Sequence, residues 1–313
     1  MNTSSQRILV TGAGGPAGIN ALKLLKHQPN VVAIGVDCDP LAAGQFFAHE
    51  FELSARVDSP NYAQDLRRLI QKWSIDIVVP TVSEELSVVR AACEGTGVKV
   101  LVSSDEALTL CETKQRQYEW MQREFSQHCP KWSLLSSSEL WEAESYFLKP
   151  NVGRGARGCR LIKRDELIVL AARADASEWI VMEVLPGVEW TVDAYISETG
   201  DVAYVVPRER LQLSGGIASK GKTVKHEVLM SESSKILLKM GVRGPVCIQW
   251  KADANGVPKY VECNPRLSGA VTITALAGAD PVICLLAELR GQACPKPEWK
   301  ECTIIRYFEE KAL

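Results

Sequence analysis

The sequence predicts an α/β protein whose first hundred or so residues form a Rossmann-like parallel sheet, followed by mixed α+β structure. Apolar strand-like segments alternate with amphipathic helical segments up to about residue 105, which is typical of βαβ units. From Ser104 onward the pattern changes to helices and then to strands joined by glycine-rich turns. No apolar run approaches the roughly 20 residues that a membrane-spanning helix needs.

Composition limits the function classes. The 313 residues include 46% hydrophobic and 24% charged residues, and the formal net charge is -2. This balance gives no general attraction to nucleic acid or to an anionic membrane. The ten cysteines form no C-x-x-C pair and do not cluster with the four histidines, so neither zinc nor a disulfide framework is expected. We expect a cytoplasmic protein without a signal peptide.

The N-terminal region is expected to hold five strands and three helices. The strand segments are RILVTG, VVAIGVD, EFELS, DIVVPT and VKVLVSS, and the helical patterns cover residues 17–26, 62–73 and 84–94.

The first strand-to-helix turn, TGAGGPAG, has two readings. Gly12, Gly14 and Ala17 fit the G-x-G-x-x-G/A fingerprint, and Asp37 ends the next strand, as in a dinucleotide site. The other reading is a tight turn with Pro16 at the helix start, which leaves the helix N-terminus facing a cleft.

A second cleft candidate, Ser83-Glu84-Glu85, follows the strand DIVVPT, where ligands of parallel sheets bind. Its alternative is a helix N-cap with acids in the first turn.

Two lysines and a glycine-rich loop predict a phosphate site. Residues 104–125 read as helices that contain Lys114, although a helical lysine alone is usually solvated. Residues 146–163 read as a strand that delivers Lys149, a loop and a returning strand. The loop contains Gly153, Arg154, Gly155, Arg157 and Gly158. Close-approaching N–H groups and added cations suit a cover over phosphates, whereas the alternative is a flexible hairpin tip.

Two later segments suggest a hinge and an anion site. The strand that ends at Glu183, the Pro186-Gly187 turn and the strand that Glu189 opens suit a hinge between two lobes. Further on, Arg208 and Arg210 precede a Ser-Gly-Gly turn that two lysines follow. This cationic hairpin predicts carboxylate or phosphate binding, or merely a solvated hairpin.

The segment 247–270 is expected to form a hairpin with a metal site. A helix over 231–241 precedes it. A two-residue type I′ turn at Asn255-Gly256 would place Gln249 opposite Glu262, and Cys247 opposite Asn264, on one face. Oxygen ligands of this kind suit Mg²⁺ or Mn²⁺. The alternative is an ordinary ion pair between Glu262 and Arg266.

In this order, the motifs resemble the ATP-grasp superfamily, and within it the carbamoyl-phosphate-synthase-like ATP-grasp ligases. The resemblance covers nearly the whole chain and rests on TGAGGPAG, DIVVPT-x-x-EE, Lys114, FLKP with GRGARG, VMEVLPGVEWTVD, Gln249 and VECNPRLSG. It implies a Rossmann-like pre-ATP-grasp domain over 1–108, a small lobe with the lid over 109–186 and a large lobe with the metal site over 187–313.

The resemblance also implies roles for individual residues. Lys114 and Lys149 would hold ATP phosphates under a lid that contains Gly153, Arg154, Gly155 and Gly158. Glu183 and Val184 would lie beside the adenine, and Glu189 beside the ribose. Gln249, Glu262 and Asn264 would bind two Mg²⁺ ions, or Mn²⁺, with Glu262 bridging. Arg266 would steady the acyl phosphate, and the substrates would lie near Gly14, Glu84, Arg208, Arg210 and Arg266.

The implied activity is an ATP-dependent carboxylate–amine or carboxylate–thiol ligase that acts through an acyl phosphate. Its partners would be small-molecule carboxylates and amines rather than nucleic acid or membrane, and a homodimer is left open. The first alternative is a non-catalytic nucleotide-binding or regulatory module. The second is an NAD-dependent oxidoreductase that uses the N-terminal turn. A complete carbamoyl phosphate synthase is not expected, because one ATP-grasp unit and no glutaminase are visible.

Overall fold

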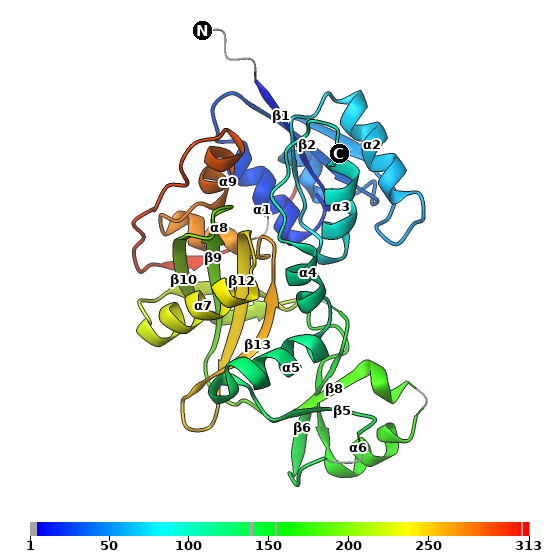
Figure 1. Ribbon diagram of the computed structural model, residues 1–313, viewed down its shortest axis with the longest axis vertical. Coiled ribbons are helices and arrows are strands. Elements are labelled where there is room, and N and C mark those ends of the chain that lie inside the picture. The colour runs from blue at the N-terminus through cyan, green and yellow to red at the C-terminus, as the bar shows by residue number, and fades with distance from the viewer. Residues whose placement is uncertain (1–4, 138–139, 154, 174, 308, 313) are drawn as a thin grey trace.

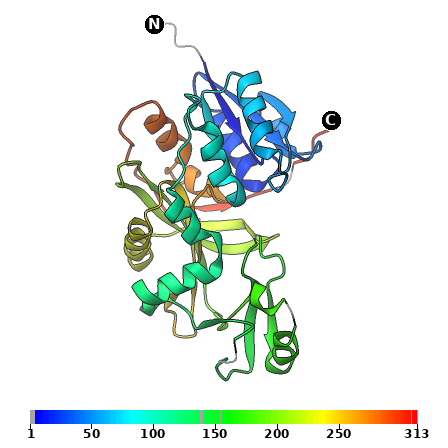
Figure 2. The same ribbon diagram turned by 45° about the vertical axis from the view of Figure 1, so that its right-hand side comes forward.

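The computed structural model describes residues 5–137, 140–153, 155–173, 175–307 and 309–312. These residues form three sheets in an elongated molecule, with the N-terminal sheet at one end and the smaller lobe at the other (Figure 1). The largest sheet lies between them, and the view in Figure 2 shows the same order. Within the described ranges, no helix is both long and apolar enough to span a bilayer.

The N-terminal sheet is parallel, in the order β3-β2-β1-β4. Its strands are β1 (Gln6–Val10), β2 (Val31–Asp37), β3 (Glu50–Leu53) and β4 (Ile77–Val79). The fifth strand expected over 98–104 is wrong, since this segment joins the sheet only through an Ile77–Lys99 bridge. Beyond it the chain leaves the sheet edge, and Ser103 bonds to the backbone of Arg243 in the large lobe.

Helices cover both faces of this sheet, as its buried strands require. Helix α1 (Pro16–Leu25) packs on one face, while α2 (Tyr62–Lys72) and α3 (Leu86–Cys93) pack on the other. The C-terminal helices α8 (Val271–Leu276) and α9 (Pro281–Leu289) lie against α1. They bring the N-terminal sheet and the large sheet into one shared core.

The small lobe is an antiparallel sheet in the order β5-β8-β6-β7. Its strands are β5 (Trp132–Leu134), β6 (Ser145–Pro150), β7 (Arg160–Lys163) and β8 (Trp179–Met182), and its helix is α6 (Arg164–Ala171). Two capped helices lead into it, α4 (Asp105–Glu112) and α5 (Lys114–Glu124). Ser104 caps α4 by accepting from the Ala107 N–H, and Thr113 caps α5 by accepting from the Arg116 N–H.

The large sheet has the order β13-β12-β9-β10-β11-β14. Its strands are β9 (Glu189–Ile196), β10 (Val202–Ser214), β11 (Ile217–Thr223), β12 (Gly244–Ala252), β13 (Pro258–Asn264) and β14 (Thr303–Ile305). The apolar alternate residues of β9 face α5 and α7 (Glu227–Met240), whereas Thr191 and Asp193 face the other side. Helix α7 begins before the predicted residue 231 because His226 caps it, and it ends at Gly241 as expected.

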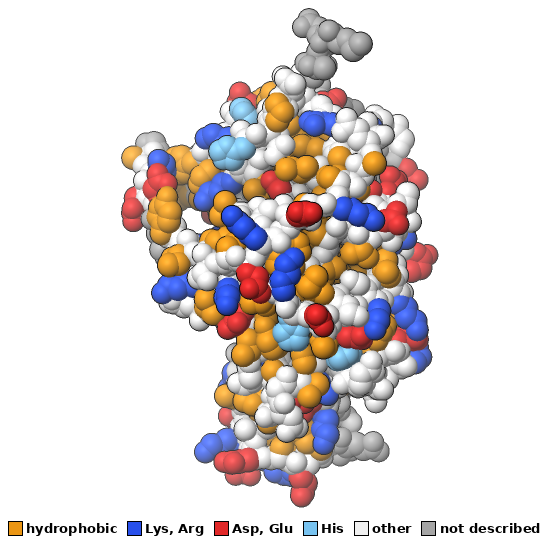
Figure 3. Space-filling model, turned by 90° about the vertical axis from the view of Figure 1, so that its left-hand side faces the viewer, with side chains coloured by type: hydrophobic (Ala, Val, Ile, Leu, Met, Phe, Trp, Pro, Cys, Tyr) orange, Lys and Arg blue, Asp and Glu red, His pale blue; other side chains and the backbone are white. Residues whose placement is uncertain are grey.

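Short 3₁₀ turns complete the fold: η1 (Ala43–Phe46), η2 (Ser83–Glu85), η3 (Ser126–His128) and η4 (Ala176–Glu178). On the face drawn in Figure 3, acidic and basic side chains are interspersed, and the molecule narrows toward the small lobe.

The β12–β13 hairpin confirms the predicted register but not the predicted turn. Gln249 pairs with Glu262, and Cys247 pairs with Asn264. The expected two-residue turn is wrong: Asp253 closes a three-residue turn by accepting at its carboxylate from the Asn255 and Val257 N–H groups. This turn shifts the register by one residue. A β-bulge between the Trp250–Tyr260 and Gln249–Glu262 pairs leaves Val261 extra and shifts the register back.

Candidate active site

Polar side chains form two rows across one face of the large sheet. Register places Glu262, Gln249, Thr191 and Arg208 side by side on β13, β12, β9 and β10. The neighbouring row holds Asn264, Cys247 and Asp193. Burying a row of polar side chains costs free energy unless these groups are paired or bind a ligand. This face is therefore the candidate site.

Glu262 lies at the β13 end of the first row, next to Asn264 and Lys114. Its Oε1 accepts from Asn264 Nδ2 at 3.1 Å, and its Oε2 lies 3.8 Å from Lys114 Nζ. The Oε1 of Gln249 lies 3.5 Å from Arg210 Nη1. The described residues contain no group of three or more His, Cys, Asp and Glu side chains that could hold a metal. One carboxylate and two amides fit Mg²⁺, but such a set is weakly charged by itself.

Lys149 is fixed in the buried wall beside this row. Its side chain, with 2% of its surface exposed, donates to the Tyr118 hydroxyl and to the Val261 carbonyl at 3.3 Å. Val261 is the bulge residue, and its carbonyl also accepts from Tyr118 at 2.7 Å. Burial lowers the pKa of Lys149 from 10.5 to about 8, while the neighbouring Glu262 carboxylate acts in the opposite direction.

Lys114 joins the lid to Glu262. It begins α5, where the Asn151 carbonyl and side chain accept from the Lys114 and Gln115 N–H groups. Its Nζ donates to the Gly153 carbonyl at 3.2 Å. Gly155 and Gly158 adopt positive φ, as a glycine loop allows. Arg154, which the sequence assigns to the lid, lies outside the described residues.

The glycine-rich loop meets the turn between β10 and β11. A Cβ on Gly216 would lie only 2.9 Å from the Gly155 carbonyl carbon and oxygen, so the two backbones touch. Arg210 donates to the Gly216 carbonyl and so fixes this turn. The glycine-rich loop and the hairpin tip together line one side of the cavity described below.

The segment that the sequence predicts to be a hinge runs from Glu183 to Val188, between β8 and β9. The Glu183 carboxylate accepts from the Lys131 N–H at 2.8 Å, and its own N–H donates to the Lys131 carbonyl. The half-buried Val184 follows it. At the far end Glu189 forms ion pairs with Arg210 and Lys251. These acids are thus engaged with neighbouring backbone or cations.

A cavity of about 560 Å³ separates the large sheet from the N-terminal sheet. Among the predicted substrate residues, Gly14, Arg208, Arg210 and Arg266 line it, together with Gln249, Glu262 and Asn264. Glu84 is exposed and is not among its lining residues, whereas the adjacent Ser83 and Glu85 are. Lys114 and Lys149 are not among its lining residues.

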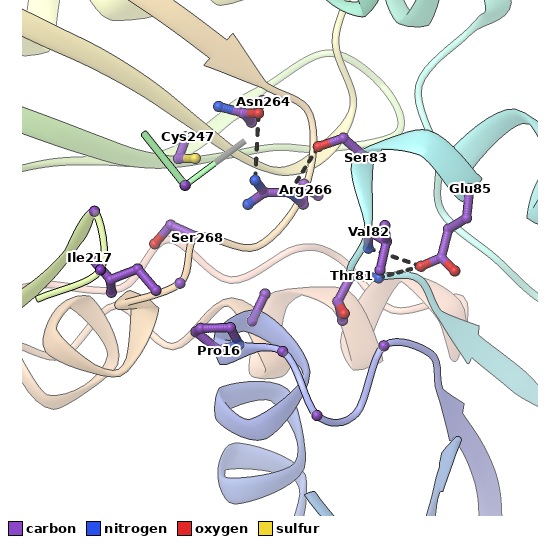
Figure 4. Close-up of a pocket in the computed structure, with 18 of the residues that line it drawn as sticks. Pro16, Thr81, Val82, Ser83, Glu85, Ile217, Cys247, Asn264, Arg266 and Ser268 are labelled. Atoms are coloured by element: carbon purple, nitrogen blue, oxygen red, sulfur yellow. Dashed lines mark hydrogen bonds between the residues drawn. The ribbon is translucent and has the colours of Figure 1, made fainter. Parts of the chain in front are cut away.

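Glu85 explains the turn that follows β4. Its buried carboxylate accepts from the Thr81 and Val82 N–H groups, both at 2.9 Å (Figure 4). It also accepts from the hydroxyls of Thr11 and Tyr62. The alternative reading of a helix start with a capping acid therefore fits Glu85. Burial raises its pKa, and these four hydrogen bonds oppose that rise.

Asp193 lies on the site face, although the sequence analysis assigns it no role. It is buried, and its Oδ2 accepts from Arg208 Nε at 2.8 Å and from the Thr274 hydroxyl. Arg208 is also buried, and its Nη2 donates to the Ser268 hydroxyl at 3.2 Å. The signal was its place in a strand between apolar neighbours, where a carboxylate requires a partner.

Side chains from neighbouring segments pack against and bond to the N-terminal glycine turn. Asp37, which would face a ribose in a dinucleotide site, accepts from the Gly14 N–H at 2.7 Å and the Asp39 N–H at 3.0 Å. A Cβ on Gly12 would lie 2.6 Å from a Val82 methyl, and one on Gly14 would lie 2.9 Å from the Ala42 Cβ. Close packing therefore accounts for the glycines.

Comparison with known proteins agrees with this arrangement. Residues 175–311 match the family model described as ATP-grasp in the biosynthetic pathway with Ter operon. The N-terminal residues 8–101 match the PylC-like N-terminal domain. The C-terminal part of the chain therefore matches an ATP-grasp family, and its N-terminal part matches a PylC-like domain. The PylC-like match covers the N-terminal sheet, and the ATP-grasp match covers the sheet that carries the polar rows.

Solved structures share the ATP-grasp fold at low sequence identity. An N5-carboxyaminoimidazole synthetase from Staphylococcus aureus, complexed with ADP, is 15% identical with a TM-score of 0.75, over 96% of this chain and 82% of that one. Biotin carboxylase from Campylobacter jejuni is 18% identical with a TM-score of 0.75, over 94% and 73%. Pyruvate carboxylase from Rhizobium etli is 18% identical with a TM-score of 0.73, over 93% of this chain, which spans 29% of that enzyme.

A comparison with curated protein sequences gives no match. The predicted fold, a Rossmann-like N-terminal domain followed by an ATP-grasp fold, is confirmed by the family matches and the solved structures. ATP-grasp proteins are ATP-dependent ligases, which agrees with the enzyme class expected from the sequence. The oxidoreductase alternative is not favoured.

Proposed function

We propose that this ATP-grasp protein is an ATP-dependent ligase that joins a small-molecule carboxylate to an amine or a thiol through an acyl phosphate. One observation carries the proposal. Two lysines from separate elements lie close to the metal row: Lys114 bonds to the glycine loop and lies 3.8 Å from Glu262, and Lys149 donates to the carbonyl of the preceding residue, Val261. Phosphoryl transfer requires positioning and charge neutralisation more than covalent help, and this arrangement offers both.

The proposed nucleotide site lies between the lobes. Lys114 and Lys149 would contact the phosphates of ATP, and the lid of Gly153, Arg154, Gly155 and Gly158 would cover them. The backbone near Glu183 and Val184 would face the adenine, because the Glu183 carboxylate itself already accepts from Lys131. Glu189, at the start of β9, would reach the ribose.

Gln249, Glu262 and Asn264 are proposed to hold two Mg²⁺ ions, with Mn²⁺ as a substitute. Their oxygen atoms share one face in adjacent register, which suits a hard divalent cation. Bound there, the metal would neutralise phosphate charge and orient the transferred group. Asn264 now donates its Nδ2 to Glu262 and directs its Oδ1 toward Arg266, so its amide would have to turn to offer oxygen.

The remaining residues are proposed to serve the substrates. The substrate carboxylate attacks the γ-phosphate of ATP, which gives an acyl phosphate and ADP, and the amine or thiol then displaces phosphate. Arg266 would steady the negative oxygens at the reacting carbon. Gly14, Glu84, Arg208 and Arg210 would surround the cavity and its entrance, although Asp193 already balances the charge of Arg208.

We further propose the boundaries 1–108, 109–186 and 187–313 for the three structural units, a homodimer in solution and a cytoplasmic location. No nucleic acid or membrane is among the proposed partners.

The test is ADP release in Mg-ATP with pooled amino acids and small carboxylates, with and without added amines. We expect a pool that stimulates ADP release and yields a condensed product of matching mass. If the protein binds ATP but none of the pools stimulates ADP release, the result would favour a non-catalytic nucleotide-binding module.

A further inference from the structure

The loop that follows β13 carries Arg266 and is held from three distant parts of the chain. The Gly269 carbonyl accepts from Asn20 Nδ2 on α1 at 2.9 Å and from Arg306 Nη1 after β14 at 3.1 Å. Ser268 accepts from Arg208. These bonds fix the backbone of the loop, but none of them fixes the direction of the Arg266 guanidinium.

The guanidinium of Arg266 has two kinds of partner. Its Nη1 donates to the Leu267 carbonyl at 2.7 Å, and its Nη2 lies a long 3.5 Å from Asn264 Oδ1. Leu267 lies in the same loop, and Asn264 is the last residue of β13. Its Nε donates to the hydroxyl of Ser83 at 3.0 Å, across 183 positions of sequence. Of the contacts made by the described residues, this one ties the guanidinium to the N-terminal domain.

Ser83 is itself rigidly placed. It begins the 3₁₀ turn η2, directly after two residues whose N–H groups both donate to the buried Glu85 carboxylate. Figure 4 shows Arg266 joined by dashed lines to both Ser83 and Asn264. A hydrogen-bonded path therefore runs from the core of the N-terminal domain to the Glu262 row.

We propose that Ser83 is a positioning residue for Arg266, through which the N-terminal domain completes the ligase site. This inference rests on the function proposed above. A guanidinium is a planar fork whose orientation decides which oxygens it can contact. Without the Ser83 hydroxyl, the Nε–H loses its partner and the fork is free to rotate toward the cavity or the metal row. The reacting carboxylate then meets a misdirected cation, while the lysines that face ATP are untouched.

The first experiment separates the two substrates kinetically. Ser83→Ala is expected to raise the KM for the amino acid or small carboxylate that releases ADP fastest by about tenfold, with the KM for ATP unchanged. Ser83→Thr keeps a hydroxyl at the same place and should restore most of the loss. Ser87→Ala, at an exposed serine of α3, is the matched control and should behave as wild type. Wild-type kinetics in Ser83→Ala, or an equal rise in both KM values, would overturn the proposal.

The second experiment needs no turnover and so remains decisive if the proposed ligase activity is absent. In protein labelled with ¹⁵N-arginine, the Nε–H signal of Arg266 is identified by its loss in Arg266→Lys. We expect its exchange with water to be slow in wild type and Ser83→Thr, and about tenfold faster in Ser83→Ala, with unchanged circular dichroism and Tm. Equal exchange rates in wild type and Ser83→Ala would reject the positioning role by itself.

Discussion

Lys149 shows how one buried side chain sets a pH range. Its pKa of about 8, lowered by burial, means that the free protein loses this charge at mildly alkaline pH. Because phosphate binding needs the protonated amine, kcat/KM for ATP should fall as pH rises through about 8. Lys149→Arg should abolish that decline, and Lys149→Ala should raise the KM for ATP about tenfold or more.

The same group links pH to stability. In the unfolded chain the amine keeps its proton up to 10.5, so between about 8 and 10.5 the unfolded state binds more protons than the folded one. This group alone therefore makes stability rise with pH across that range. A Lys149→Met variant with the same pH slope of Tm as wild type would contradict this account.

Glu262 offers a second prediction at the scale of the residue. Glu262→Gln removes the carboxylate of the oxygen row and should lower turnover about a hundredfold or more while the Tm stays near that of wild type. Manganese titration followed by electron paramagnetic resonance should show tight binding only with ATP present, because the row has one carboxylate. Tight Mn²⁺ binding without nucleotide would contradict this prediction.

At the scale of the element, the hinge depends on one glycine. Gly187 donates to the Ala252 carbonyl, and a Cβ at Gly187 would lie 2.6 Å from the Ala252 Cβ and 3.0 Å from its carbonyl oxygen. Gly187→Ala should therefore push the hinge away from β12 and cost about 1–3 kcal/mol of stability. Urea unfolding monitored by tryptophan fluorescence measures this, and an unchanged midpoint would show that the hinge yields freely.

Local patterns predicted the elements better than their partners. The strands around Lys149 and the caps at Ser104 and Gly241 follow from alternation, capping and glycine chemistry, which act between neighbours in sequence. Ser83 and Arg266 meet across 183 positions, and Asp193 meets Arg208 across two strands. No local pattern encodes such contacts. The sequence therefore indicated which face of the sheet carries the site, but not the long-range hydrogen bonds that hold Arg208 and Arg266 in place.

The segment 98–104 shows a second reason for a wrong prediction. Its apolar alternation suits a strand, yet only Lys99 joins the sheet. Tertiary contacts with the large lobe at Arg243 outweigh the local preference.

At the scale of the whole molecule, the N-terminal sheet and the large sheet share one hydrophobic core. Leu22 on α1 belongs to the same cluster as Tyr195 and Val206 of the large sheet, whereas Leu167 belongs to a separate small-lobe cluster. Leu22→Ala should cost about 2–5 kcal/mol and accelerate hydrogen exchange in both β1 and β9. Leu167→Ala, its matched control, should accelerate exchange only in the small lobe. Faster exchange in β1 with no change in β9 would show that the two sheets open independently.

The extra residue in β13, Val261, supports Lys149 without affecting the pairing of Gln249 with Glu262. Deleting Val261 would straighten the ladder, keep Glu262 opposite Gln249 and Tyr260 opposite Trp250, and remove the carbonyl that holds Lys149 and Tyr118. A chain shortened by one residue would thus retain its metal geometry while its phosphate-facing amine loses its support. Chain length at this position, rather than residue identity, should tune ATP affinity, and the deletion variant should show a raised KM for ATP in steady-state assays.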